Sequence, residues 1–472
     1  MRRHLIPCLI LLFAATGALG EPRRAPRVDR VIEAGHLPYG SVSFIVADVD
    51  SGAVILARNP ATPRGPGSVM KLLTTFAALD TLGPAFTWRT RAFADAPIVR
   101  GVLRGNLYLK GGGDPYMTIE RWWRFAAELR ATGLKTIRGN VVIDDRAFSL
   151  PSEDPAAFDG HPNRPYNVIP DAMMVNFQSV DYRVAPNPAA HRVDVAAIPR
   201  PINLTIDDDV RLVGGRCAGA GDRVAYTVDS PLRDHVVFSG TMSLHCGPEV
   251  FTRAVMRAPQ FAYGTFVQLW RELGGRVVGG YQDGGTPPGA RVLVDFASMP
   301  LSEVVRLTDK FSNNVMARTI MLTLGERRYG APATLDKGIT VLEAWSHEHR
   351  IPLAGTVIVN GSGLSRKTRV SAETVAALLR VAYHSRYAPE FLASLPIAGV
   401  DGTLRREMTE TVPGTVRLKT GHIDDVSAVA GYVRTRRGRT YVLVSFVNDP
   451  RVATGAAERV HRALVDWILA HG

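Results

Sequence analysis

The chain has 472 residues, enough for roughly two to four domains. Hydrophobic residues make up 46% of it and charged residues 21%, which is ordinary globular composition and excludes a disordered or fibrous protein. The formal net charge is +12, but the arginines are scattered and no nucleic-acid-binding motif is present, so no nucleic-acid partner is expected. Only seven of the 56 basic residues are lysines, so each lysine is a candidate for chemistry that arginine cannot perform.

The first twenty residues have the pattern of a signal peptide. A basic start is followed by an apolar run over Leu5–Leu19 and by the small-x-small triplet at 18–20. The pattern predicts a signal peptide over residues 1–20 and export to the periplasm, with an uncleaved anchor as the alternative. No other apolar run approaches the length of a membrane span.

Two cysteines remain once the signal peptide is removed. They are Cys217 and Cys246, an even pair in an oxidising compartment. This favours a disulfide between them, with two buried thiols as the alternative.

In chain order, the first elements expected are a hairpin and a helix. The alternation over Ser41–Ala57 predicts two strands joined by a turn. Apolar residues at helical spacing predict a helix with Ser68 in its first turn, ending at Leu82 before a Gly-Pro pair. From about 90 to 255 the pattern changes to short strands and loops, apart from a helical stretch over Ile119–Thr132.

Helices return after residue 257 and the chain ends in strands and a helix. The expected helices are Pro259–Leu273, Leu301–Thr323, Leu335–His349, Ser371–Ser385 and Ala456–Ala470. The expected strands near the end are Val416–Thr420, Val426–Arg434 and Tyr441–Val447.

These elements predict an α+β fold. An antiparallel sheet flanked by helices is expected from residues 22–90 and 258–472. A mainly β region over 91–257 is expected as an insertion of one or two domains, with about 101–170 nested within the rest.

Residues 68 to 71 read Ser-x-x-Lys at the start of the predicted helix. The spacing puts Ser68 and Lys71 on one face, about one turn apart. A serine hydroxyl is a poor nucleophile until a base takes its proton, and a lysine with a lowered pKa can be that base. The alternative is a capping serine followed by a surface lysine, and the motif alone occurs by chance roughly 0.3 times in such a chain.

Two further motifs follow in order. Residues Ser312 to Asn314 read Ser-Asn-Asn, a hydroxyl and a carboxamide that enter a helical pattern, with a plain helix cap as the alternative. Residues Lys419 to Gly421 read Lys-Thr-Gly on a predicted strand, where a cation and a hydroxyl can hold a carboxylate. The alternative there is an ordinary strand end with a bend. The numbers of chance matches expected for the three motifs, multiplied together, come to roughly one in a hundred. The three motifs also stand in the order that they have in penicillin-interacting serine enzymes.

On these motifs the chain resembles the penicillin-binding protein 4-type D-alanyl-D-alanine carboxypeptidases/endopeptidases. The 243 residues between Ser68 and Ser312 are far more than compact β-lactamases have, and they imply the large insertion of that family. Residues 107–115, 360–366 and 399–404 also resemble family landmarks. The resemblance covers nearly the whole mature chain and implies a serine β-lactamase/DD-peptidase-like domain.

The resemblance implies acyl transfer at the bond between two D-alanines. Ser68 would be the acylated nucleophile and Lys71 the base that activates it. Ser312 would pass a proton to the leaving amine, and Asn314 would hold a substrate amide. The backbone N–H groups of Ser68 and His422 would form the oxyanion hole.

The third motif would bind the substrate carboxylate. Lys419 and Thr420 would contact it, and Gly421 would let the substrate approach the strand. Two positions depart from the family pattern: Asn313 stands where Asp is usual, and His422 where Ser or Thr is frequent. His422 is either a pH-sensitive neighbour or an incidental strand residue.

The resemblance therefore implies an exported hydrolase of peptidoglycan peptides that β-lactams acylate and that needs no metal or cofactor. The alternatives are a β-lactamase, for which no deacylating base is identified, and an inactive wall-binding scaffold. Asp114 and Asp159 are candidates to meet the amine of a diamino acid in the stem peptide, with solvated carboxylates as the default. The basic charge would suit peripheral association with an anionic wall or membrane surface.

Overall fold

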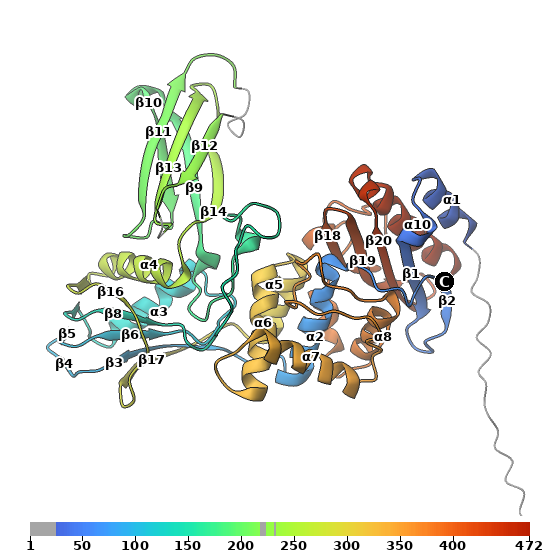
Figure 1. Ribbon diagram of the computed structural model, residues 1–472, viewed down its shortest axis with the longest axis horizontal. Helices are drawn as coiled ribbons and strands as arrows, with labels where there is room; N and C mark the ends of the chain where they lie inside the picture. The colour runs from blue at the N-terminus through green and yellow to red at the C-terminus, as the bar shows by residue number, and fades with distance from the viewer. Residues whose placement is uncertain (1–24, 218–222, 231–232) are drawn as a thin grey trace, which may run out of the picture.

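The computed structural model describes residues 25–217, 223–230 and 233–472. The predicted signal peptide over residues 1–20 lies outside this part. No helix within it is long and apolar enough to cross a bilayer. Figure 1 shows two bodies side by side: a main body of residues 25–88 and 299–472, and an inserted body of residues 89–298 that extends away from it.

The main body is built on one antiparallel sheet with the strand order β18-β19-β20-β1-β2. β1 and β20 are buried along nearly their whole length because both faces of the sheet are covered, so both read as apolar runs. The predicted N-terminal hairpin and C-terminal strands are confirmed. The strands are β1 (Val42–Asp48), β2 (Val54–Arg58), β18 (Val416–Ile423), β19 (Val426–Arg434) and β20 (Thr440–Asn448).

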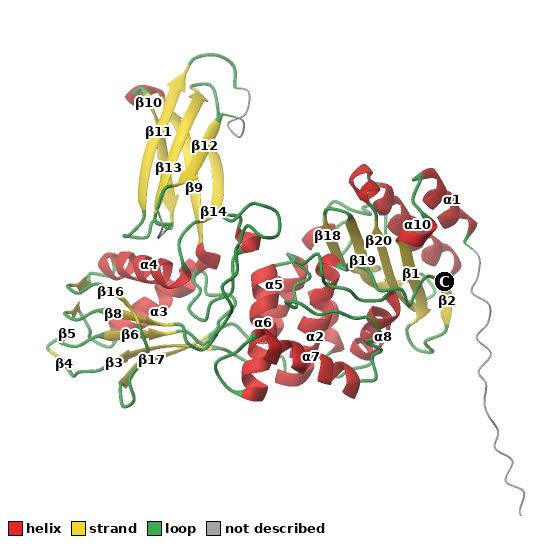
Figure 2. Ribbon diagram, viewed as in Figure 1, coloured by secondary structure: helices red, strands yellow, loops and turns green. Residues whose placement is uncertain are grey.

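Helices cover both faces of this sheet (Figure 2). Alternate residues of β19 point to opposite sides: Ala430 joins the core under one helical layer, and Val429 joins the core under the other. One layer is α1 (Pro26–Ala34) and α10 (Ala456–His471). The other is α2 (Lys71–Leu82), α5 (Leu301–Lys310), α6 (Asn314–Tyr329), α7 (Leu335–Glu348), α8 (Ala372–Tyr383) and α9 (Ala388–Ser394).

The single helix predicted over 301–323 is wrong, because the chain forms two helices there. Phe311 ends α5, and Ser312 takes a left-handed conformation with φ of 57°. The Asn313 side chain then accepts a hydrogen bond from the Met316 N–H at 3.0 Å and caps α6. A helical apolar period continues across the break, so the pattern alone did not reveal it.

The inserted body begins with two mixed sheets and two helices. The strand orders are β16-β8-β6-β3-β17 and β15-β7-β5-β4. The helices are α3 (Ile119–Ala131) and α4 (Ala258–Glu272). The strands are β3 (Arg89–Ala94), β4 (Ile98–Val99), β5 (Val102–Leu103), β6 (Leu107–Lys110), β7 (Thr136–Ile137), β8 (Val141–Asp144), β15 (Arg276–Val277), β16 (Tyr281–Asp283) and β17 (Arg291–Ala297).

A sandwich of two three-stranded sheets, β10-β9-β14 and β11-β13-β12, projects from this body (Figure 1). The predicted disulfide is confirmed: Cys217 is bonded to Cys246, with a Cα–Cα distance of 5.0 Å. The strands are β9 (Ser179–Asn187), β10 (Arg192–Ile198), β11 (Thr205–Val213), β12 (Val224–Val228), β13 (His235–Ser243) and β14 (Glu249–Ala254).

The predicted limits of the insertion need correction. The prediction returned residues from 258 onward to the peptidase domain, but α4 packs against α3, and β17 pairs with β3 in the inserted body. Residues 101–170 were expected to be nested, but their strand β8 pairs in parallel with β16, so the nested part is instead the sandwich over 179–254. Pairing across about 140 residues leaves no local trace in the sequence.

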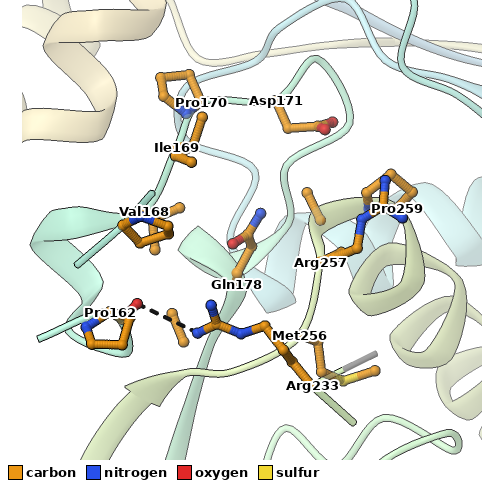
Figure 3. Close-up of a pocket in the computed structure, with 13 residues that line it drawn as sticks. Pro162, Val168, Ile169, Pro170, Asp171, Gln178, Arg233, Met256, Arg257 and Pro259 are labelled. Atoms are coloured by element: carbon orange, nitrogen blue, oxygen red, sulfur yellow. Dashed lines mark hydrogen bonds between the residues drawn. The ribbon is translucent and has the colours of Figure 1, made fainter. Parts of the chain in front are cut away.

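The sandwich joins the rest of the insertion around a cavity of about 200 Å³ (Figure 3). Arg233 spans the junction: it donates to the Val255 carbonyl at 2.9 Å and to the Asn163 side chain. Pro162 and Ile169 line the same cavity. Both residues belong to the loop over 153–171, which reaches the main body. The sandwich therefore contacts this loop and supports it from the side of the insertion.

Candidate active site

The Ser-x-x-Lys motif lies at the centre of the main body. A single 3₁₀ turn, Gly67–Met70, carries Ser68, and α2 begins at Lys71. The Lys71 side chain is fully buried. Its Nζ lies 2.7 Å from Ser68 Oγ, 2.6 Å from Asn314 Oδ1 and 2.7 Å from the Ser362 carbonyl oxygen. The predicted pair is therefore in direct contact, and the first two motifs meet at this amine.

The surroundings of Lys71 favour its neutral form. Burial lowers the pKa of the Lys71 amine well below its ordinary value, and the charge of Lys419 lowers it further. The carboxylate of Asp309 opposes both effects. A buried amine with a lowered pKa is what a general base for a serine hydroxyl requires.

The second and third motifs also meet. Ser312 Oγ accepts a hydrogen bond from Lys419 Nζ at 2.9 Å, and the same amine donates to the Thr420 carbonyl at 2.7 Å. Lys419 is fully buried, and burial lowers its pKa to about 8. Ser68, Ser312 and Thr420 are only half-buried, so three hydroxyls face the solvent side of two buried lysines.

Gly421 lets β18 approach the turn that carries Ser68. A Cβ atom at this position would lie 2.3 Å from the Pro66 carbonyl oxygen and 2.8 Å from the Ser68 nitrogen. Gly67, with φ of 49°, faces the same strand from the other side. The strand and the turn therefore touch backbone to backbone, which a side chain at position 421 would prevent. That Gly421 also lets the substrate approach the strand stays a prediction.

Thr420 and His422 flank this contact. Thr420 Oγ1 donates to Thr403 Oγ1 at 2.7 Å, and Thr403 lies in the 3₁₀ turn Gly402–Leu404, within the landmark at 399–404. The His422 side chain is exposed at the end of β18. Its role as a pH-sensitive neighbour stays a prediction.

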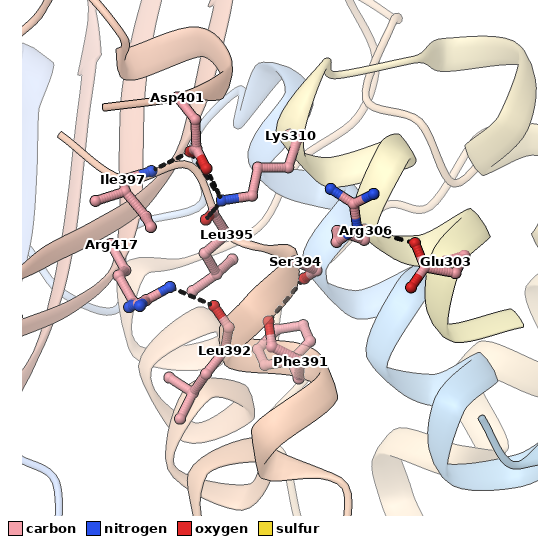
Figure 4. Close-up of polar contacts among 10 residues, drawn as sticks. All are labelled: Glu303, Arg306, Lys310, Phe391, Leu392, Ser394, Leu395, Ile397, Asp401 and Arg417. Atoms are coloured by element: carbon pink, nitrogen blue, oxygen red, sulfur yellow. Dashed lines mark hydrogen bonds and ion pairs between the residues drawn. The ribbon is translucent and has the colours of Figure 1, made fainter. Parts of the chain in front are cut away.

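An ion pair between the buried Lys310 and the half-exposed Asp401 fixes the break that presents Ser312 (Figure 4). Lys310 Nζ lies 2.6 Å from Asp401 Oδ2 and donates to the Leu395 carbonyl at 2.8 Å. Asp401 also accepts from the Ile397 N–H at 2.9 Å. The end of α5 is thus tied to the segment that contacts Thr420. Sequence reasoning missed this pair, although Lys310 is one of the seven lysines.

The inserted body also reaches the site. Asn314 Nδ2 donates to the Tyr166 carbonyl at 3.2 Å, and the Tyr166 hydroxyl donates to Asp159 at 2.7 Å. Both Glu153 carboxylate oxygens lie 2.7 Å from an Arg318 nitrogen on α6. Asp114 lies elsewhere, buried inside the inserted body. Of the two carboxylates considered, only Asp159 belongs to the loop beside the motifs.

A cavity of about 340 Å³ lies between this loop and residues 359–367 of the main body. Arg366 stacks over the Phe158 ring at 5.2 Å and pairs with Asp424. The cavity is lined by both bodies, so the insertion and the main body together shape the space next to the motifs.

Comparison with known proteins agrees with this geometry. The D-Ala-D-Ala carboxypeptidase 3 (S13) family matches residues 25–470. The chain belongs to this family. It is 32% identical to a D-alanyl-D-alanine carboxypeptidase of Actinomadura sp. (strain R39) over 445 residues, which cover 89% of this chain and 80% of that one.

Two further matches support the S13 assignment. D-alanyl-D-alanine carboxypeptidase DacB of Haemophilus influenzae is 24% identical over 418 residues, 87% of this chain and 86% of that one. The crystal structure of penicillin binding protein 4 (dacB) from the same organism superposes with a TM-score of 0.78 at 24% identity, over 93% of this chain and 99% of that one. The α+β fold with a large insertion is therefore the fold of a penicillin-binding protein.

Proposed function

We propose that this S13 chain is a serine D-alanyl-D-alanine carboxypeptidase and/or endopeptidase that works through an acyl-enzyme on Ser68. The observation that most supports this proposal is the contact of the buried Lys71 amine with Ser68 Oγ. As an ammonium, Lys71 would donate to Ser68, Asn314 and Ser362 together. As a neutral amine it donates to the last two and turns its lone pair toward the Ser68 hydroxyl, which is the arrangement of a base.

Acylation transfers the carbonyl of the peptide from D-alanine to Ser68. The Ser68 oxygen attacks the carbonyl carbon between two D-alanines, and its proton moves to Lys71. The proton passes through Ser312 to the amide nitrogen, the C–N bond breaks, and D-alanine leaves as its amine. Water then adds to the Ser68 ester and releases the shortened peptide. In endopeptidase mode the leaving amine belongs to a crosslinking residue.

The remaining motif residues hold the substrate. The cationic amine of Lys419 and the hydroxyl of Thr420 receive the terminal carboxylate, and Asn314 holds a backbone amide of the peptide. The backbone N–H groups of Ser68 and His422 stabilise the oxyanion. Ser68 would attack a β-lactam at its ring carbonyl carbon. The amine released by ring opening stays attached to the acyl group and does not diffuse away, so the acyl-enzyme persists.

The setting of this activity is the cell wall. The predicted signal peptide supports export to the periplasm, where stem peptides of peptidoglycan are the substrates. The net charge of +12 supports peripheral association with an anionic wall or membrane surface.

The test is release of D-alanine from a pentapeptide that ends in D-Ala-D-Ala. Wild-type protein should release it, and Ser68→Ala should release none above the uncatalysed background. Ser302→Ala, on the α5 helix away from the motifs, is the matched control and should retain wild-type rates. Equal activity in Ser68→Ala and wild type would overturn the proposal.

A further inference from the structure

One fully buried carboxylate beneath the site has no part in the steps above. Asp309 lies on α5, and its side chain is inaccessible to solvent. Asp309 Oδ2 accepts from Thr75 Oγ1 on α2 and from Ser394 Oγ on α9, both at 3.0 Å. Asp309 Oδ1 is buried and accepts no hydrogen bond from the described part of the chain.

A buried carboxylate such as that of Asp309 lowers the stability of the fold unless other groups stabilise its negative charge. A buried carboxylate with one oxygen unpaired loses hydration that two hydroxyl donors do not replace. The charged groups that act on Asp309 are the two active-site lysines, Lys419 from β18 and Lys71 from α2, and the interaction with Lys419 is the larger. Both amines are also fully buried. Thr75, which donates to Asp309, lies one helical turn after Lys71 and also contacts the Lys71 carbonyl at 2.8 Å, so Asp309 lies next to the turn of α2 that carries Lys71.

We propose that Asp309 is a positioning residue that decides which of the two active-site lysines carries the proton. Its carboxylate stabilises the ammonium of Lys419, which is needed for the substrate carboxylate. One anion balances one cation, so Lys71 remains a neutral base. This inference rests on the proposed function and adds to it a residue that touches neither substrate nor Ser68.

The charge balance explains why both lysines tolerate burial. With all three groups ionised, they would together hold a net charge of +1 out of contact with water, which is unfavourable. With Lys71 neutral, the negative charge of Asp309 balances the positive charge of Lys419, and the net charge is zero. Burial raises the pKa of Asp309 to about 6 and lowers that of Lys419 to about 8, so both are ionised between these values. The pKa of Lys71 is lowered by burial and then by Lys419.

The test is the pH profile of Ser68 acylation by a fluorescent penicillin. The acid limb reports protonation of Lys71, and the alkaline limb reports loss of the proton from Lys419. Asp309→Asn removes the negative charge, so both lysines lose their protons more easily. Both limbs should move to lower pH by about one unit, and acylation at pH 9 should be about tenfold slower than in wild type.

Two controls separate charge from structure. Asp295→Asn removes a carboxylate in the inserted body and should leave both limbs in place. Ser394→Ala removes a hydrogen bond to Asp309 but keeps its charge, so the alkaline limb should not move. A uniform fall in rate for Asp309→Asn, with both limbs unmoved, would overturn the inference.

A second variant covers the case in which Asp309→Asn does not fold. Thr75→Val with Ser394→Ala keeps the carboxyl group but removes both donors, which makes its ionised form less stable. The acid limb should then move to lower pH, as in Asp309→Asn, and an unmoved acid limb would refute the role. Absence of any adduct in wild type would instead refute the proposed function, so the two failures are distinguishable.

Discussion

Replacing Gly421 by alanine tests the backbone contact that joins the third motif to Ser68. The added Cβ would lie 2.3 Å from the Pro66 carbonyl oxygen and 2.8 Å from the Ser68 nitrogen. Ordinary contacts of this kind begin above 3 Å, so β18 and the Ser68 turn must separate by somewhat less than 1 Å. Both partners are backbone, so no side chain can rotate out of the way.

The expected result is a large fall in the rate of Ser68 acylation in a protein that still folds. A displacement near 1 Å in a catalytic arrangement costs about 100-fold. We therefore expect Gly421→Ala to acylate with penicillin about 100-fold more slowly, in a stopped-flow or gel-based fluorescence assay. The matched control is Gly40→Ala, because a Cβ at Gly40 meets nothing within 4 Å and should change neither rate nor melting temperature. A Gly421→Ala protein with wild-type acylation would refute the reasoning.

Three further changes have defined outcomes. Lys71→Arg replaces the base by a group that cannot lose its proton, so penicillin acylation should fall by about 10²–10⁴-fold, and wild-type rates would contradict this. Cys217→Ala with Cys246→Ala should destabilise the sandwich by about 2–4 kcal/mol in calorimetry and leave the acylation rate unchanged. His461 is buried and burial lowers its pKa to about 4, so the unfolding free energy should fall by about 2 kcal/mol from pH 7 to 5. That fall should be absent from His461→Gln, as measured by denaturant titration at both pH values.

The three motifs were predictable because each is local: its reactive side chains stand at a fixed, short spacing in the sequence. Ser68 and Lys71 share one helical turn, and Lys419 to Gly421 share one strand. The order of the motifs and the long gap before Ser312 pointed to one family. The folded chain brings them together as that order implies, since Lys71 contacts Asn314, and Lys419 contacts Ser312.

The remaining site residues were not predictable because they depend on distant parts of the chain. Ser362 lies within the landmark at 360–366, but it contacts Lys71 through its backbone carbonyl, a contact that no side chain in the sequence reveals. Asp309 looks like any acid at the end of an amphipathic helix until α2 and α9 bury it. Asp401 belongs to a recognised landmark, but its pairing with Lys310 needs the segment to fold back on α5.

The limits of the insertion were missed for a related reason. The helical pattern of α4 shows that it has an apolar face but not which sheet that face covers. The strands β5, β7 and β15 have only two residues each, which is too short to show a period. The pairing of β7 with β15 joins Thr136 to Arg276, which are more than 100 residues apart.

The site at which a penicillin attaches covalently tests most directly whether Ser68 is the nucleophile. The mature protein would be incubated with labelled penicillin, digested, and its peptides mapped by mass spectrometry. We expect a single slowly released adduct on Ser68. A folded protein that carries no adduct, or carries it on another residue, would contradict the central claim that Ser68 is the nucleophile.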